Sequence, residues 1–240
     1  PGTVYRIESV TKLFEAMEMM QQRDAGKYQV SDAVASYVPE VSYSYDVPNL
    51  GTTTTWYPSF LELASHTSGL PDAVPALSGT SSEQIQKFWQ YLNTQTVTTP
   101  RAYQYSDLGT VAMGQAVALI AGCNNSGAGQ AFHQYVTEQI LQPLGMTAST
   151  FDYETVPPRD LAIPYLASGQ SWTPATDALD FNFPLAGDVF TSVQDMAKLI
   201  SLQFKTGPAG GTQILACTSI QEMWQPVAPT VPRAFPTCAS

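Results

Sequence analysis

Charged side chains, and cations above all, are scarce in this sequence of 240 residues. Lysine and arginine together number 10 against 20 aspartates and glutamates, so the formal net charge is −10 at pH 7. Nucleic acids and anionic membranes attract proteins mainly through clustered cations. The composition therefore excludes nucleic acid and membrane surfaces as expected partners and predicts an acidic surface.

Long apolar segments are missing as well. No run approaches the roughly 18 residues that span a bilayer, and the amino terminus lacks a basic segment followed by an apolar one. We expect a globular chain from which any export signal has been removed. Asn124-Asn125-Ser126 is an acceptor sequence for N-glycosylation, and together with the acidic composition it favours a secreted or extracytoplasmic protein.

Cysteine occurs only at positions 123, 217 and 238, without the paired close spacing of metal sites. Zinc is therefore not expected, and no metal or organic cofactor is predicted. One disulfide and one free thiol would account for three cysteines. We expect Cys217 to pair with Cys238, because both lie in the terminal segment and close a short loop.

Helix patterns dominate the chain, whereas alternating strand patterns are scarce. A helix is predicted from Ser9 to Arg23, with apolar residues at helical spacing before the stop at Asp24-Ala25-Gly26. Further helices are predicted from Leu108 to Ala121 and from Phe132 to Leu141. Capping-box starts are expected at Ser59 with Glu62, Ser81 with Gln84, Ser192 with Asp195, and Thr218 with Gln221. The segments Val41 to Thr55 and Tyr165 to Asp180 are expected to be irregular loops.

Ser9 and Lys12 form the first candidate for chemistry. Residues three apart lie on one face of a helix, one turn away from each other. A serine hydroxyl becomes a nucleophile when a base takes its proton, and lysine serves if its pKa is lowered. The alternative is that Ser9 is an ordinary helix cap and Lys12 an exposed residue of the first turn, and the four-residue pattern alone favours this second interpretation.

Six ordered segments decide between these alternatives. They are Tyr5-Arg6-Ile7-Glu8-Ser9-Val10-Thr11-Lys12-Leu13-Phe14, Asp24 to Glu40, Leu63-Ala64-Ser65-His66-Thr67-Ser68-Gly69-Leu70-Pro71, Tyr103-Gln104-Tyr105-Ser106-Asp107-Leu108-Gly109, Gln139 to Thr147, and Ala186 to Ser192. Together these segments resemble the serine β-lactamase and penicillin-binding-protein superfamily, in particular class C β-lactamases and related esterases.

The resemblance implies roles for particular residues. Ser9 would be the acylated nucleophile, and Lys12 and Tyr105 would handle its proton. His66 corresponds to a histidine in a structural turn without a role in proton transfer. We interpret His133 as a surface or half-buried residue, because the sequence reveals no buried acid that would complete a histidine-dependent triad.

Two residues depart from the family pattern. Asp107 replaces an asparagine whose amide can donate to a substrate carbonyl, and a carboxylate beside Lys12 would keep the amine protonated. We still expect Asp107 to contact the substrate, and we expect ester chemistry in preference to lactam hydrolysis. Glu8 stands where a glycine is common, and it either adds negative charge near the site or points to solvent.

Relatives carry sheet before the nucleophile and, after the last helix, a strand with a Lys-Thr-Gly or His-x-Gly motif. Lys205-Thr206-Gly207 has the letters of that motif but comes too early, so we interpret it as a helix stop. We expect one domain over residues 1–240, truncated at both ends, with 226–240 as a tail.

The expected fold is mainly helical, the helical region of the α+β β-lactamase fold with most of its antiparallel sheet missing. In relatives the missing strand supplies one donor to the oxyanion, and losing such a donor typically costs about 100-fold to 1000-fold in rate. The expected function is that of a serine hydrolase or acyltransferase for an ester, amide or β-lactam, with a second chain as one means of completing the sheet. The alternative is a noncatalytic helical remnant or binding domain.

Overall fold

The computed structural model describes residues 2–74, 81–122, 130–175, 187–204 and 212–227. The helices in these ranges are α1 (Lys12–Asp24), α2 (Phe60–Ala64), α3 (Ser81–Asn93), α4 (Asp107–Ile120), α5 (Gln130–Val136), α6 (Val193–Gln203) and α7 (Cys217–Met223). The strands are β1 (Val4–Arg6), β2 (Tyr43–Val47), β3 (Thr52–Trp56), β4 (Thr96–Val97), β5 (Tyr165–Ser168), β6 (Ser171–Pro174) and β7 (Phe190–Ser192).

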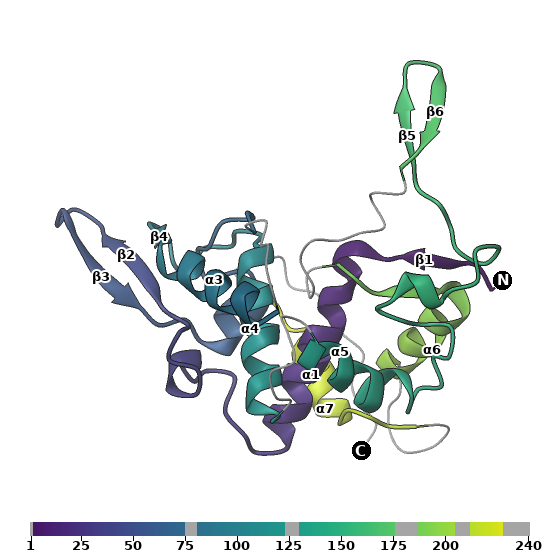
Figure 1. Cartoon of the computed structure of the whole chain (residues 1–240). Coiled ribbons are helices and arrows are strands. Elements are labelled where there is room, and N and C mark those ends of the chain that lie inside the picture. Colours follow the sequence, from purple (N-terminus) through teal and green to yellow (C-terminus); the bar gives the residue numbers. More distant parts are fainter. Residues whose placement is uncertain (1, 75–80, 123–129, 176–186, 205–211, 228–240) are drawn as a thin grey trace.

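Helices α1 and α4 form the centre of the molecule, and α2, α5 and α7 pack around them (Figure 1). Helix α4 is buried on all sides from Leu108 to Ala118, as expected for a helix made almost entirely of apolar and small residues. Phe14 and Met17 of α1 are fully buried against it in one core cluster. The expected helices near residues 9–23 and 108–121 are thus present and supply most of the core.

The described strands form three small sheets. β1 pairs antiparallel with β7, β2 lies between β3 and β4, and β5 pairs with β6 in a hairpin that projects from the body (Figure 1). The prediction that Val41 to Thr55 and Tyr165 to Asp180 are irregular was wrong wherever these strands form. Exposed strands such as β3 and β5 need no alternation of apolar and polar residues, so the pattern that identifies half-buried strands is missing from them.

One expected helix start and one expected helix end differ in detail. Helix α7 begins at Cys217 with Ala216 as its N-cap, so Thr218 lies inside the first turn and does not cap the helix. Helix α5 ends at Val136, and a π-helical turn continues the predicted helix from Thr137 to Leu141. The capping box of Ser59 and Glu62 is confirmed in both directions, with hydrogen bonds of 3.1 and 3.0 Å.

At Ser192 the side chain accepts from the Asp195 amide, but the Asp195 carboxylate bonds elsewhere, to Ala148 and Lys198. Helix α3 begins at Ser81, whose side chain lies outside the description. The expected features at Asn124-Asn125-Ser126, Lys205-Thr206-Gly207 and most of the tail 226–240 also lie outside the described residues. Cys217 is disulfide-bonded, and both Cys123 and Cys238 fall outside the described ranges, so the predicted pairing stays a prediction.

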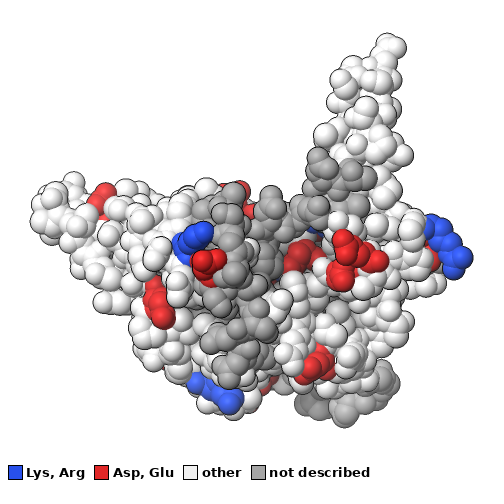
Figure 2. Space-filling model, in the orientation of Figure 1, with Lys and Arg blue, Asp and Glu red and all other residues white. Residues whose placement is uncertain are grey.

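Uncharged groups cover most of the face shown in Figure 2, where acidic side chains form isolated patches and basic ones are fewer. This agrees with the acidic composition. No helix in the described part of the chain is long and apolar enough to cross a membrane.

Candidate active site

Ser9 lies in a short 3-10 turn, Glu8–Thr11, between β1 and α1. The predicted helix therefore begins later than expected, at Lys12. The backbone of Glu8 has a φ of 49°, a left-handed conformation that a glycine adopts at lower cost. This conformation reverses the chain between strand and helix.

The residues just before β7 hold this turn in place. The Ile7 amide donates to the Val189 carbonyl at 3.0 Å, and Arg6 Nε donates to the Gly187 carbonyl at 2.8 Å. Gly187 lies so close to the turn that a Cβ atom there would be 3.2 Å from the Glu8 carbonyl carbon. After the nucleophile, the Val189 amide donates to Thr11 Oγ1 at 3.3 Å, so residues next to β7 hold both flanks of Ser9.

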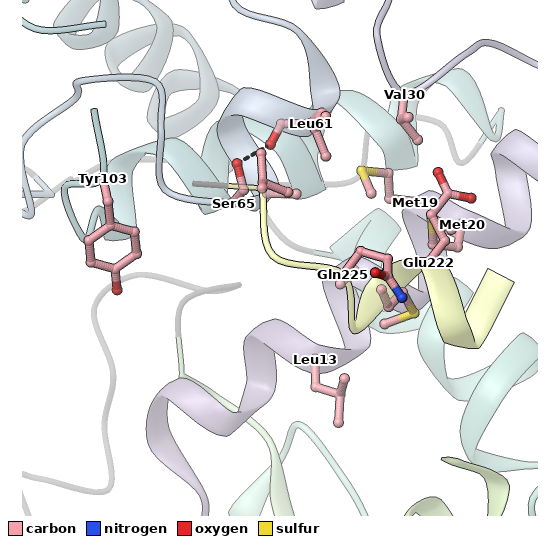
Figure 3. A pocket seen from close by; sticks show the side chains of 13 residues that line it. Leu13, Met19, Met20, Val30, Leu61, Ser65, Tyr103, Glu222 and Gln225 are labelled. Atoms are coloured by element: carbon pink, nitrogen blue, oxygen red, sulfur yellow. Dashed lines mark hydrogen bonds between the residues drawn. The ribbon is translucent and has the colours of Figure 1, made fainter. Parts of the chain in front are cut away.

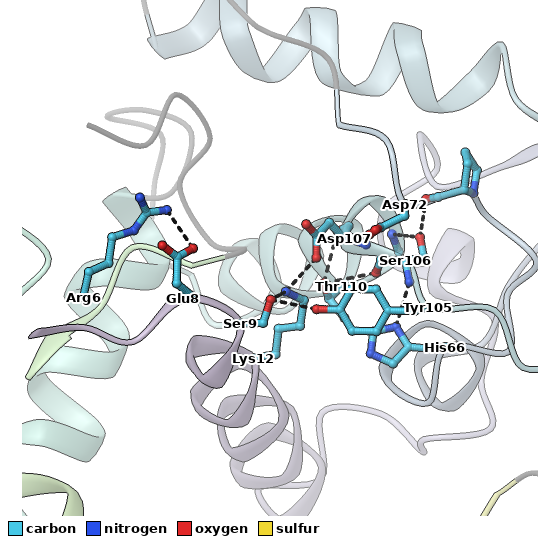
Figure 4. Close-up of polar contacts among 12 residues, drawn as sticks. Arg6, Glu8, Ser9, Lys12, His66, Asp72, Tyr105, Ser106, Asp107 and Thr110 are labelled. Carbon is cyan, nitrogen blue, oxygen red and sulfur yellow. Dashed lines mark hydrogen bonds and ion pairs between the residues drawn. The ribbon is translucent and has the colours of Figure 1, made fainter. Parts of the chain in front are cut away.

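Two side chains meet at the Ser9 hydroxyl (Figure 4). Lys12 Nζ donates to Ser9 Oγ at 2.9 Å, and the Tyr105 hydroxyl donates to the same oxygen at 2.8 Å. The Lys12 ammonium also lies 5.3 Å from the centre of the Tyr105 ring. Residues 96 positions apart therefore converge on one oxygen, in the geometry that a serine nucleophile with two proton-handling neighbours requires.

The Tyr105 side chain enters the site from a loop that is anchored at both ends. The Gln104 amide donates to the His66 carbonyl at 2.8 Å. After Tyr105, the Ser106 hydroxyl caps helix α4 by accepting from the Gly109 amide and donates to the Pro71 carbonyl. These bonds fix the direction in which the phenol points.

His66 packs its ring against the Tyr105 ring and helps to position it. Its backbone is left-handed, with a φ of 57°, its Nδ1 accepts from the Ser106 amide at 3.1 Å, and its ring lies 4.4 Å from that of Tyr105. Burial lowers the pKa of His66, and the charge of Lys12 lowers it further. A neutral imidazole in a tight turn fits the structural role that the resemblance implied.

Asp107 lies next to Lys12, with 2.7 Å between Nζ and Oδ1. Burial favours a lower pKa for Lys12, but hydrogen bonds to Asp107 and Tyr105 and the charge of Asp107 outweigh it, so the pKa of Lys12 is raised above its usual value. Lys12 is therefore an ammonium ion at neutral pH. As expected from the sequence, the carboxylate in place of asparagine keeps the amine protonated.

Glu8 does not enter the site. Its carboxylate lies 3.3 Å from Arg6 Nη2 and its side chain is 66% exposed, so of the two expectations for this residue the one that points it to solvent holds. Figure 4 shows the Arg6 and Glu8 pair apart from the Ser9 cluster.

Sequence reasoning missed three acidic residues near the core. Asp188 bonds to His133 at 2.5 Å, so the half-buried histidine does have an acid partner. Glu15 and Glu18 are fully buried on α1. The helix prediction rested on the spacing of the apolar residues and did not include these two acids in the core. The charged residues at positions 12, 15 and 18, one every three residues, were the available signal.

An apolar cavity of about 380 Å³ lies along α1, between that helix, α2 and α7 (Figure 3). Leu13, which follows Lys12, and Tyr103, which precedes the catalytic candidate Tyr105 by two residues, belong to its lining, whereas Ser9 and Lys12 do not. Among the described residues no group of three histidine, cysteine or acidic side chains could hold a metal ion.

Comparison with known proteins gives consistent matches. A family model described as Beta-lactamase matches residues 1–237. Beta-lactamase-like protein 2 of Dictyostelium discoideum is 32% identical in an alignment that covers 93% of this chain and 39% of that protein. The octameric penicillin-binding protein homologue from Pyrococcus abyssi superimposes with a TM-score of 0.69 at 22% identity, covering 93% of this chain and 49% of that one.

A class C β-lactamase in complex with cefoxitin gives a TM-score of 0.64 at 21% identity, covering 92% of this chain and 55% of that one. At these identities the structural likeness shows a shared fold. The chain spans less than half the length of the curated relative from Dictyostelium discoideum.

Proposed function

The chain belongs to the β-lactamase family, and we propose that it is a serine hydrolase or acyltransferase in which Ser9 is acylated by an ester or amide. The observation that carries this proposal is the pair of hydrogen bonds that Lys12 and Tyr105 make to the Ser9 oxygen. Both neighbours lie within hydrogen-bond reach of Ser9 Oγ, as groups that deprotonate a serine and protonate a leaving group must.

The proposed reaction gives Lys12 and Tyr105 different tasks. Lys12 is cationic because the Asp107 carboxylate raises the pKa of the lysine amine. The Lys12 ammonium therefore stabilises negative charge on the neighbouring oxygens. As Ser9 Oγ attacks the carbonyl carbon, its proton passes to the Tyr105 oxygen, and Tyr105 gives up its own hydroxyl proton towards the leaving group in the same step. The bond from the carbonyl carbon to the leaving group then breaks, and the leaving group receives the proton from Tyr105. Water or another acceptor releases the acyl group by the reverse sequence.

We propose esters as the preferred substrate class. An asparagine amide at position 107 could donate a hydrogen bond to a lactam or peptide carbonyl, whereas an ionised carboxylate only accepts. Asp107 is already bonded to Lys12. Activated esters need less help from such a donor than amides do, because their leaving groups are better.

A noncatalytic binding domain is the second candidate function. The ion pair of Lys12 and Asp107 favours it, because the carboxylate neutralises the cation beside the nucleophile. In that case the Ser9 cluster would hold a ligand or a partner without forming a covalent bond.

Intact mass spectrometry distinguishes the two candidates. The chain is incubated with an activated ester and, separately, with a β-lactam, and Ser9→Ala is compared with the exposed-serine control Ser36→Ala. We expect one acyl adduct with the ester, slower labelling with the lactam, loss of the adduct in Ser9→Ala and no change in Ser36→Ala. If neither reagent labels the protein, or if Ser9→Ala is labelled equally, the catalytic proposal is wrong and the binding domain remains.

A further inference from the structure

Helix α1 carries two buried acidic residues in a row below the Ser9 site. Glu15 and Glu18 are both 0% exposed. Among the described residues, none of their four carboxyl oxygens has a hydrogen-bond partner. Burying a polar group without a partner costs on the order of 1–3 kcal/mol, so apolar side chains at these positions would make a more stable core. Such departures from good packing tend to occur at functional sites.

We propose that Glu15 is a positioning residue of the Ser9 site that acts on Lys12 from the interior of the molecule. This inference rests on the proposed function. Glu15 follows Lys12 by three residues, so the two side chains leave the same face of α1 one turn apart. On its other side the Lys12 ammonium bonds to Asp107 and to Ser9. Lys12 thus has a partly exposed carboxylate as its bonded partner and a buried carboxyl group one helical turn away.

The charged surroundings of Glu15 come from three elements. Lys12 and Glu18 share α1 with it, Asp107 opens α4, and Asp188 precedes β7. Asp188 is itself paired with His133 of α5.

Burial raises the pKa of Glu15 well above its usual value, Lys12 opposes this rise, and the two aspartates add to it. Among the charged groups that affect the pKa of Glu15, Lys12 is the one cation and the one that favours the ionised carboxylate.

The dependence is reciprocal. A carboxylate at Glu15 raises the pKa of Lys12, and an ammonium at Lys12 lowers the pKa of Glu15. Two groups that interact in this way titrate as a coupled pair. When Glu15 is ionised, its charge and that of Asp107 both favour the cationic form of Lys12, which leaves Tyr105 to accept the proton of Ser9.

Glu18 provides a matched control. It is equally buried, lies one turn further along α1 and also has a raised pKa. Its pKa responds to burial and to Glu15, and not to Lys12. A change at Glu18 therefore reproduces the effect on packing without the effect on the site.

The test compares Glu15→Gln with Glu18→Gln in the full chain. The five lysines of the sequence are reductively methylated with ¹³C-formaldehyde, and the Lys12 resonance, assigned with Lys12→Arg, is followed by NMR as pH rises. We expect Glu15→Gln to move the Lys12 midpoint to lower pH by about half a unit or more, the scale of a charge removed one helical turn away. We expect no comparable shift in Glu18→Gln.

An unchanged midpoint in Glu15→Gln, or equal shifts in the two variants, would overturn the inference. The lysine titration needs no catalysis, so it decides the role of Glu15 even if Ser9 is never acylated, an outcome that would contradict only the proposed function. Where acylation by the activated ester is observed, the basic limb of its pH–rate profile should move with the Lys12 midpoint.

A measurement on the unsubstituted protein covers the case in which Glu15→Gln does not fold. The ¹³C chemical shift of the Glu15 carboxyl carbon is recorded over the same pH range. A coupled pair gives a second inflection at the Lys12 midpoint, and a single inflection away from that midpoint would contradict the proposal.

Discussion

Replacing Asp107 with asparagine should convert Lys12 from a fixed cation into a group that titrates more easily. The change keeps an oxygen that can accept from Lys12 and removes the negative charge. At the 2.7 Å separation of Nζ and Oδ1, Coulomb's law with an effective dielectric constant of 20 gives a gross attraction of about 6 kcal/mol. Hydration of the two groups offsets most of this energy, because the Asp107 side chain is 26% exposed.

Neighbouring opposite charges at such distances typically shift a pKa by about one to three units, and each unit is a tenfold change in the fraction of neutral amine. Asp107→Asn should therefore lower the pKa of Lys12 and move the basic limb of the acylation profile to lower pH. It also introduces an amide donor, so labelling by a β-lactam should rise relative to labelling by an ester.

The assay is the rate of Ser9 acylation, followed by intact mass across pH 5 to 10, with Asp72→Asn as the control. Asp72 accepts from the Asp107 amide at 3.1 Å through an oxygen that asparagine retains. An acylation profile that is identical in Asp107→Asn and the unsubstituted chain, or a profile that shifts equally in Asp72→Asn, would refute the assigned role of the carboxylate.

Three further predictions concern stability and assembly of the site. Ser106→Ala removes the N-cap of α4 and should lower the free energy of unfolding by about 1 kcal/mol, measured in urea. Gly187→Ala places a Cβ atom against the Glu8 backbone and should slow Ser9 acylation more than it reduces stability, whereas loss of stability alone would contradict this. Because burial raises the pKa of Glu18, its contribution to stability is full below about pH 4.3 and is lost as pH rises through the folded-state value. Between about pH 4.3 and the folded-state pKa of Glu18, Glu18→Gln should gain stability over the unsubstituted chain by up to about 1.4 kcal/mol per pH unit, and parallel stability curves in guanidinium chloride would count against it.

The central helices could be predicted because a buried helix carries apolar residues at helical spacing, and this pattern is visible in the sequence. Phe14 and Met17 recur on the buried side of α1, and the run from Leu108 to Ala118 is too apolar to be anything but internal. The hairpins β2–β3 and β5–β6 carry no such pattern, because β3, β5 and β6 are mainly exposed. Their strands are held by backbone bonds and by β-branched threonines as in β3, a propensity that depends on context more than helix propensity does.

The candidate site was predicted only in part for a related reason. Ser9, Lys12 and Tyr105 lie in recognisable segments, and the effect of Asp107 on Lys12 follows from charge alone. The 3-10 turn at Ser9 and the left-handed backbone of His66 depend on contacts with distant segments, which local patterns do not encode. Glu15 was overlooked because a helix pattern assigns charged residues to the exposed face.

The bonds between the Ser9 turn and the residues beside β7 also bear on when the site can form during synthesis. Arg6 and Gly187 are 181 positions apart, and closing so long a loop follows local helix formation. At the roughly 5–20 residues per second of translation, β7 is synthesised on the order of ten to forty seconds after β1, the strand with which it pairs. Helices α1 and α4 can pack in that interval, so a nascent chain acquires its helical core well before its nucleophile is set.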